Sequence, residues 1–465
     1  MHTRTTLLLF LALLLASPLQ AQDVVIRNAT VLTVTKGTLE DTDIVISGGI
    51  ITQIGKDLRA PRGAEEIDAA GKFVMPGIID AHAHIALSSI NEGASPVTAE
   101  VSMEDVTDPY DLGIYRALAG GVTTSHTMHG SANVIGGQNE TIKHRWGSVN
   151  PDAIRFDGAP RTIKFALGEN PTRVHGRRGS GGTGSIVPAT RMGVEQVLRS
   201  AFENGKRYME AWDAYHVEVK TNPRAVPPAW NERLEVMADI LRGEILIHCH
   251  SYRADEIVML TRVLNDYGIH KITFQHANEA FKVAPELAAY GAHASVFADW
   301  WSYKMEVYYS TAYNAAILTR NGVVTSVNSD SGELNRHLYH EAAKTQRYGG
   351  LSDDEALALI TINPAIQLGI QDRVGSIEIG KDGDVAVFEG HPLSIYAVPV
   401  MTFVDGVKQF DRNADPDDMR VEVNPSAQIG QYEGQITGRD HIHETEVADL
   451  MDFLGEVAEI HVDHR

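Results

Sequence analysis

The chain has 465 residues, 43% of them hydrophobic, and its 40 basic and 61 acidic side chains give a formal net charge of −21. This length corresponds to two or three domains or to one α/β barrel with additions, and the apolar content excludes a disordered chain. The acidic balance disfavours a nucleic-acid partner, because phosphate binding depends on Lys and Arg, and a single cysteine excludes an internal disulfide and a zinc site of several thiolates.

Residues 1–21 have the pattern of a secretory signal peptide. Arg4 precedes an unbroken apolar run from Leu7 to Ala16, and a short segment ending at Ala21 follows, where cleavage is expected. The run is about half the length of roughly 20 apolar residues that a membrane span needs. We therefore expect a periplasmic or secreted protein with no membrane association after removal of the signal.

Two strand-rich ends flank a longer α/β segment. Short β-branched runs with Gly and polar breaks fill residues 24–74 and return within 374–406, which is typical of antiparallel strands. We predict one small β-sandwich domain built from residues 22–75 and 366–410. Residues 76–365 alternate apolar strand candidates with helical stretches such as 194–204 and 233–242, which predicts βα units and a parallel sheet.

The last segment, residues 411–465, holds fourteen acidic and four basic side chains. Apolar residues at helical spacing from Thr445 to Val457 predict a short amphipathic helix after a linker. We interpret this segment as an acidic extension docked on the barrel or on a second subunit, so a homo-oligomer stays open.

The segment from Pro76 to His84 carries the strongest chemical pattern. His82 and His84 end an apolar strand candidate, and because strand side chains alternate, both imidazoles face the same side and can reach one cation. In a chain with 20 histidines such a pair is a weak signal by itself.

Other metal-type side chains stand at the ends of further strand candidates. His250 and His276 are 26 residues apart, about one βα unit, and Asp330 follows 54 residues later, about two units. With Lys164, these residues fall on strands 1, 4, 5, 6 and 8 of an eight-stranded barrel, at the C-terminal mouth where such barrels keep their sites. The 86 residues from Lys164 to His250 imply an insertion at about residues 170–230.

These features together resemble the amidohydrolase superfamily of metal-dependent hydrolases. They are the Pro-Gly-x-x-Asp-x-His-x-His segment, the histidines on strands 5 and 6, the aspartate on strand 8, and the closing stretches 363–365 and 375–384. Over about residues 23–408 the chain is most similar to the imidazolonepropionase-like and secreted peptidase-like branch. The resemblance implies a (β/α)8 TIM-type barrel, a β-sandwich from both chain ends, and one or two divalent metal ions, usually zinc.

The resemblance also assigns roles to single residues. Asp330 becomes the proton shuttle as well as a metal ligand, and the other matched ligands are His82, His84 and His276.

Two strand positions have alternatives. On strand 5 we favour His250, which lies nearer the strand's C-terminal end, with His248 as an inward-facing group behind it. On strand 4, members with two metals use a carboxylated lysine and others a glutamate, so Lys164 and Glu169 both stay open, with a slight preference for Lys164.

Loops at the barrel mouth usually set substrate specificity. We expect the Gly-rich, basic stretch at residues 136–146 to be such a loop, and its residues His144 and Arg145 are candidates for binding a substrate carboxylate. Tyr252 and His248 are further candidates for substrate contact.

These residues predict a secreted metal-dependent hydrolase that cleaves a carbon–nitrogen bond of a small molecule. The favoured substrate is an amide in a dipeptide, an N-acyl amino acid or a cyclic amide. A bound cation lowers the pKa of water to about 7, and Asp330 would move the proton. The alternatives are a deaminase of a heterocycle and, from another class, a non-catalytic metal- or ligand-binding protein on the same scaffold.

Overall fold

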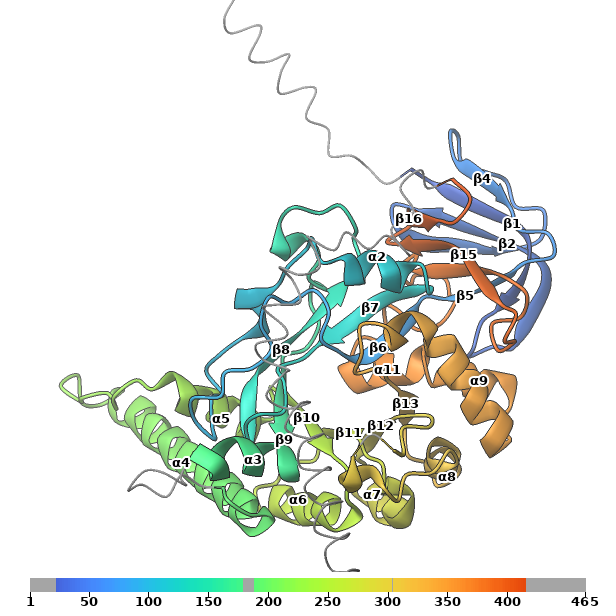
Figure 1. Ribbon diagram of the computed structural model, residues 1–465. Coiled ribbons are helices and arrows are strands. Elements are labelled where there is room, and N and C mark those ends of the chain that lie inside the picture. The colour runs from blue at the N-terminus through green and yellow to red at the C-terminus, as the bar shows by residue number, and fades with distance from the viewer. Residues whose placement is uncertain (1–21, 179–187, 303, 415–465) are drawn as a thin grey trace, which may run out of the picture.

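Two sheets of eight strands each organise the part of the chain that the structure describes (Figure 1). The computed structural model describes residues 22–178, 188–302 and 304–414. The expected signal peptide and tail helix, and part of the expected insertion, lie outside these residues. Within the described residues, we find no helix with the length and apolar character needed to cross a membrane.

The first sheet, which we call the composite sheet, unites the two strand-rich ends. Its order is β16-β15-β14-β5-β1-β2-β3, with β4 beside β1. Its strands are β1 (Val24–Leu32), β2 (Thr38–Ser47), β3 (Ile50–Gly55), β4 (Glu65–Asp68), β5 (Phe73–Pro76), β14 (Val385–Glu389), β15 (Val398–Val404) and β16 (Val407–Asp411). β5 and β14 join the two ends, with Val74 opposite Val387 in a buried apolar cluster. The prediction of one β unit made from both chain ends is confirmed.

The second sheet is the barrel, in the order β13-β12-β11-β10-β9-β8-β7-β6. Its strands are β6 (Ile78–Ala83), β7 (Val122–Thr127), β8 (Ile135–Lys143), β9 (Thr162–Ala166), β10 (Leu246–Ser251), β11 (Ile272–His276), β12 (His293–Val296) and β13 (Thr325–Val327). Beyond β13, the backbone N–H of Asp330 donates to the carbonyl of His82 in β6 at 3.0 Å, so the two edge strands meet. The predicted eight-stranded barrel is confirmed.

One barrel strand departs from the predicted parallel pattern. β8 pairs antiparallel with both β7 and β9. The Gly-rich stretch that the sequence predicts as a loop is therefore a strand. Its glycines allow close packing, since a Cβ on Gly137 would lie 2.6 Å from Val101 Cγ2.

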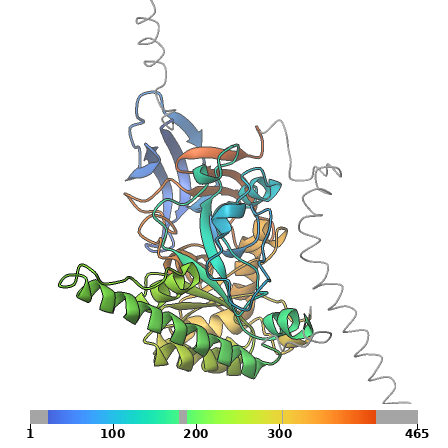
Figure 2. The same cartoon turned by 90° about the vertical axis from the view of Figure 1, so that its left-hand side faces the viewer.

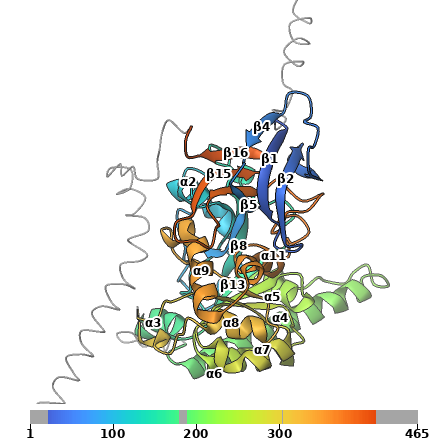
Figure 3. The same ribbon diagram turned by 90° about the vertical axis from the view of Figure 1, so that its right-hand side faces the viewer.

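Helices surround the barrel, and the composite sheet lies at one end of it (Figures 2 and 3). The helices are α2 (Leu112–Leu118), α3 (Glu169–Arg178), α4 (Arg191–Glu218), α5 (Glu232–Arg242), α6 (Ala254–Asp266), α7 (Ala284–Tyr290), α8 (Asn314–Arg320), α9 (Leu338–Gly349), α10 (Asp353–Ala358) and α11 (Ile362–Leu368). The segment expected to be an insertion contains α3 and α4. α4 begins at the N-cap Thr190, whose side chain accepts from Gly193 N, and α5 ends at the left-handed Gly243.

Candidate metal centre

The end of β6 brings two imidazoles to the barrel mouth. His82 Nδ1 meets the Gln275 side-chain oxygen at 3.2 Å, and His84 Nδ1 donates to the carbonyl of Met128 at 2.9 Å. Each ring is thus fixed through one nitrogen, and its Nε2 faces the mouth, as metal-ligating histidines are usually held.

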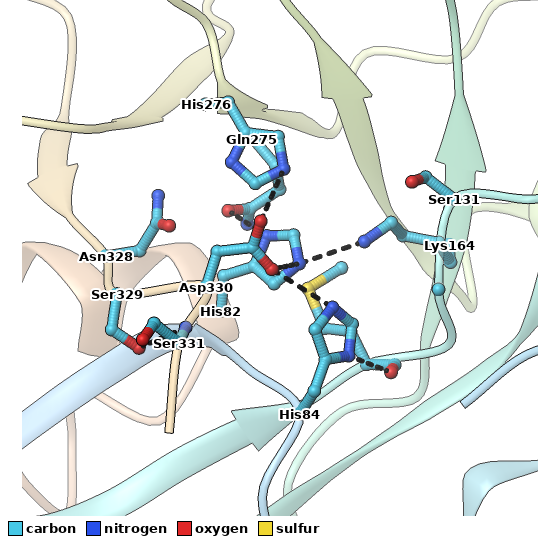
Figure 4. Close-up of polar contacts among 12 residues, drawn as sticks. His82, His84, Ser131, Lys164, Gln275, His276, Asn328, Ser329, Asp330 and Ser331 are labelled. Carbon is cyan, nitrogen blue, oxygen red and sulfur yellow. Dashed lines mark hydrogen bonds and ion pairs between the residues drawn. The ribbon is translucent and has the colours of Figure 1, made fainter. Parts of the chain in front are cut away.

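Asp330 is the carboxylate on which these rings converge (Figure 4). Its Oδ1 lies 3.1 Å from His84 Nε2 and 3.4 Å from His82 Nε2, and its Oδ2 lies 3.7 Å from His276 Nε2. One ligand atom from each of His82, His276 and Asp330 falls within 4.8 Å of the other two. Such a cluster of nitrogen and oxygen donors suits a divalent transition metal such as zinc.

Lys164 and His250 complete the group from β9 and β10. The buried Lys164 Nζ is 3.0 Å from His82 Nε2. The His250 ring centroid lies 4.7 Å from that of His276. The structure therefore brings together the matched strand-end residues and both favoured alternatives.

The two competing positions lie elsewhere. His248 sits deeper in the barrel, where its Nδ1 accepts from Gln275 at 3.0 Å and its ring lies 4.4 Å from that of His126. Glu169 stands in the first turn of α3, and its carboxylate pairs with Lys304 and with Arg173, each at 3.3 Å. The structure therefore does not support Glu169 as the strand-4 ligand, because its carboxylate is turned to two cations outside the cluster.

The pKa values of the site residues favour the protonation states that bind a metal ion. Burial lowers the pKa of His82 and His250 well below the ordinary value, and that of His276 to about 3, so these rings are neutral. Burial alone would raise the pKa of Asp330, but its neighbours His276 and His84 hold that pKa well below its usual range. The carboxylate is therefore ionised at neutral pH.

The donor set fits a bound cation. His250 Nε2 and both ring nitrogens of His276 are buried without a hydrogen-bond partner among the described residues. Unsatisfied buried nitrogens are costly unless something occupies them. A cation held between His250 Nε2, His276 Nε2 and Asp330 would satisfy one nitrogen of each ring.

His144 and Arg145 are not at the mouth, which corrects the sequence-based expectation. Because β8 is antiparallel, the chain leaves it at the opposite end of the barrel. His144 bonds there to the carbonyl of Val122, the first residue of β7, at 3.0 Å. Arg145 pairs with Asp405 of the composite sheet at 2.7 Å. His144 thus bonds within the barrel and Arg145 joins the barrel to the composite sheet, so neither side chain lies where it could bind a substrate at the mouth.

Tyr252, the other substrate candidate, does lie at the site. Its ring centroid is 4.6 Å from that of His250 and 5.4 Å from that of His276.

The sequence-based reasoning missed two supporting residues. Gln275 contacts both His82 and His248. Asp80 accepts from His82 N at 3.1 Å and from Ser329 N at 3.2 Å, which ties β6 to the segment after β13. Alternation along β11 could have placed Gln275 inside the barrel, since it lies in phase with Thr273.

An eight-stranded barrel that gathers imidazoles and a carboxylate at its mouth is the architecture of a metal-dependent hydrolase. The chain belongs to the amidohydrolase family, because the model of that family matches residues 73–414. The resemblance inferred from the motifs is therefore confirmed.

Individual relatives agree with this assignment. Amidohydrolase tasK of Hapsidospora irregularis is 32% identical over 407 residues, which cover 79% of this chain and 40% of that protein. The chain thus spans about two-fifths of the length of that relative. The 5-methylthioadenosine/S-adenosylhomocysteine deaminase of Symbiobacterium thermophilum is 25% identical and covers 82% of this chain and 92% of its own.

Among solved structures, an amidohydrolase from Thermotoga maritima MSB8 is similar with a TM-score of 0.76 and 34% identity. The match covers 84% of this chain and all of that one (100%). Fold, site and relatives together favour an enzyme of the hydrolase and deaminase type that acts on carbon–nitrogen bonds.

Proposed function

We propose that the enzyme hydrolyses an amide of a small molecule, such as a dipeptide, an N-acyl amino acid or a cyclic amide, with a zinc-type divalent cation. The observation that carries this proposal is the convergence of His82, His84 and His276 on Asp330 within 3.1–3.7 Å. When bound, the cation would polarise the carbonyl oxygen and lower the pKa of water.

Asp330 is the residue that moves the proton. Its carboxylate is ionised and its side chain is 20% exposed, so it can be reached from the mouth. It would accept a proton from the attacking water on one oxygen and deliver that proton to the leaving nitrogen. Oδ1 lies nearer to His84 and His82 and Oδ2 nearer to His276, so the two carboxylate oxygens have different surroundings.

Lys164 supports a site with two cations. Burial lowers its pKa to about 8, so a useful fraction of the side chain is a neutral amine at physiological pH. A neutral amine can add carbon dioxide and lose a proton, which gives a carbamate anion with two ligand oxygens. We propose this form, because an unmodified ammonium group beside His82 would repel a cation.

The test is a substrate screen of the metal-loaded protein with separate detection of ammonia and of newly formed carboxylate. Amides, lactams, esters and purines are compared for wild type, Asp330→Asn and the matched control Asp299→Asn, whose carboxylate pairs with Lys344. We expect new carboxylate and amine from an amide, loss of turnover in Asp330→Asn with metal retained, and normal turnover in Asp299→Asn.

Deamination of a heterocycle is the second candidate, favoured by the similarity to a protein named as a deaminase. Ammonia released from a purine without amide cleavage would replace the amide proposal with this one. A metal-loaded wild type that turns over no compound of the panel would instead favour a ligand-binding protein.

Export to the periplasm or the medium stays a proposal that rests on the signal-peptide pattern of residues 1–21. N-terminal sequencing of the protein recovered from its native host tests it, with Gln22 expected as the first residue.

A further inference from the structure

A row of four aromatic rings runs beside the metal centre. Tyr252 follows β10, His276 ends β11 and Phe297 follows β12, so three neighbouring strands supply three neighbouring rings. The centroid of the His276 ring lies 5.4 Å from Tyr252 and 4.7 Å from Phe297, with planes 21° and 20° apart. Trp300 continues the row, with its ring 4.3 Å from Phe297 and 14° from parallel.

The backbone gives His276 an orientation that a regular strand would not. Gln275 points into the barrel, where it contacts His82 and His248. By alternation, His276 would share the side of Phe274, which packs in the apolar core. The φ of His276 is instead 65°, in the left-handed region, and the side chain turns toward Asp330. This conformation is unfavourable for a residue with a Cβ, so neighbouring groups must maintain it.

Hydrogen bonds do not supply that restraint. His82 and His84 each anchor their Nδ1, whereas neither nitrogen of the His276 ring has a hydrogen-bond partner among the residues that the structure describes. Metal-ligating histidines almost always have such an anchor, which fixes the ring orientation. Besides the 3.7 Å approach of Nε2 to Asp330, the recorded contacts of the His276 ring are with other rings, and the two that lie nearly parallel to it belong to Tyr252 and Phe297.

We propose that Tyr252 and Phe297 are positioning residues that hold the His276 imidazole in its metal-binding orientation by stacking, in place of a hydrogen bond. The proposal rests on the proposed function, since it requires a bound cation. Both rings are buried, at 1% and 5% exposure, so the stack is closed to water and restricts rotation of the imidazole.

Two pairs of variants separate the ring from other features of each side chain. Phe297→Leu and Tyr252→Leu remove the ring but keep apolar bulk, whereas Phe297→Tyr and Tyr252→Phe keep the ring. Phe403→Leu, in the buried core of the composite sheet, is the control for a lost core ring away from the site.

The measurements are the affinity for Co²⁺ and Zn²⁺, by competition with a chelator, and the visible absorption of the Co²⁺ form. We expect each leucine variant at the stack to bind the metal about 10–100-fold more weakly, as for other supporting residues of metal ligands, with a changed Co²⁺ spectrum. The ring-keeping variants should stay within about threefold of wild type, and Phe403→Leu should lower the melting temperature only.

The outcomes distinguish this proposal from the proposed function. If wild type binds metal and hydrolyses amides, yet both stack leucine variants keep the wild-type affinity and spectrum, the stack is only structural and the proposal is wrong. If Phe297→Leu does not fold, the metal affinities and Co²⁺ spectra of Tyr252→Leu and Tyr252→Phe are compared instead, because Tyr252 stacks on the opposite face of the imidazole. A wild-type protein that binds no divalent cation overturns the proposed function and this inference together.

Discussion

Lys143 joins the barrel to the composite sheet, and replacing it with methionine should destabilise the protein. Its side chain is fully buried, with Nζ 2.6 Å from Asp382, 3.1 Å from Asp384 and 2.5 Å from Asp405. The lysine ends barrel strand β8, whereas the aspartates precede β14 or lie in the turn between β15 and β16. A single ammonium group thus holds three carboxylates of the other sheet.

The magnitude follows from the charges in this cluster. Arg145 pairs with Asp405 and Arg373 with Asp382, so three cations match three carboxylates. Lys143→Met leaves one buried carboxylate without a counter-charge, which should lower the free energy of unfolding by about 3–5 kcal/mol.

The loss should depend on pH. Burial raises the pKa of Asp384 to about 6 even beside Lys143, and loss of the ammonium group would raise it further. A carboxyl with a raised pKa in the folded state contributes stability at low pH that is lost as the pH rises through that pKa. The cost of Lys143→Met should therefore be smaller at pH 5 than at pH 8.

Urea denaturation at pH 5 and pH 8, followed by tryptophan fluorescence, measures both effects. Lys408→Met is the matched control, because Lys408 is partly exposed and pairs with Glu65 at 2.8 Å and Asp411 at 3.2 Å; it should cost about 1 kcal/mol or less. The double variant Lys143→Met/Asp384→Asn should regain part of the unfolding free energy that Lys143→Met loses. The predicted role of Lys143 would be refuted if Lys143→Met lowered the free energy of unfolding no more than Lys408→Met does. The predicted pH dependence would be refuted if the loss were equal at pH 5 and pH 8.

Three further predictions concern the mouth and its supports. Burial raises the pKa of Glu256 to about 7, so stability should fall by up to about 3 kcal/mol between pH 4.5 and 8, and Glu256→Gln should remove this slope in urea titrations. Lys164→Met should lower the metal content by about one ion per chain in elemental analysis if the lysine bridges two cations, and an unchanged content would exclude the bridge. Asp80 accepts from Ser329 Oγ at 2.5 Å and Asn335 Nδ2 at 2.7 Å; Asp80→Asn should cost about 1–3 kcal/mol and weaken metal binding, measured by thermal melts and chelator competition.

The positions of most site residues could be predicted because barrel units have a nearly constant length and cations demand few residue types. That reasoning predicted the strands from which the structure brings His82, Lys164, His250 and Asp330 together. It could not predict the direction of β8. A glycine such as Gly137 is expected both in a loop and in a strand that packs closely against a neighbour, here Val101, and the sequence does not distinguish the two. The location of the residues after β8 depends on that direction, and they were therefore misplaced.

Side-chain alternation explains His82 and His84 but fails at two other site residues. His276 has a φ of 65° and Asp330 one of 46°, and each left-handed conformation costs on the order of 1–3 kcal/mol for a non-glycine residue. Neighbouring strands offset this cost, since Asp80 of β6 holds Ser329 beside Asp330, and the rings after β10 and β12 flank His276. The orientation of these two residues is therefore a property of the closed barrel and not of any single strand. It follows that the geometry of the metal centre depends on the contact between β6 and the segment after β13.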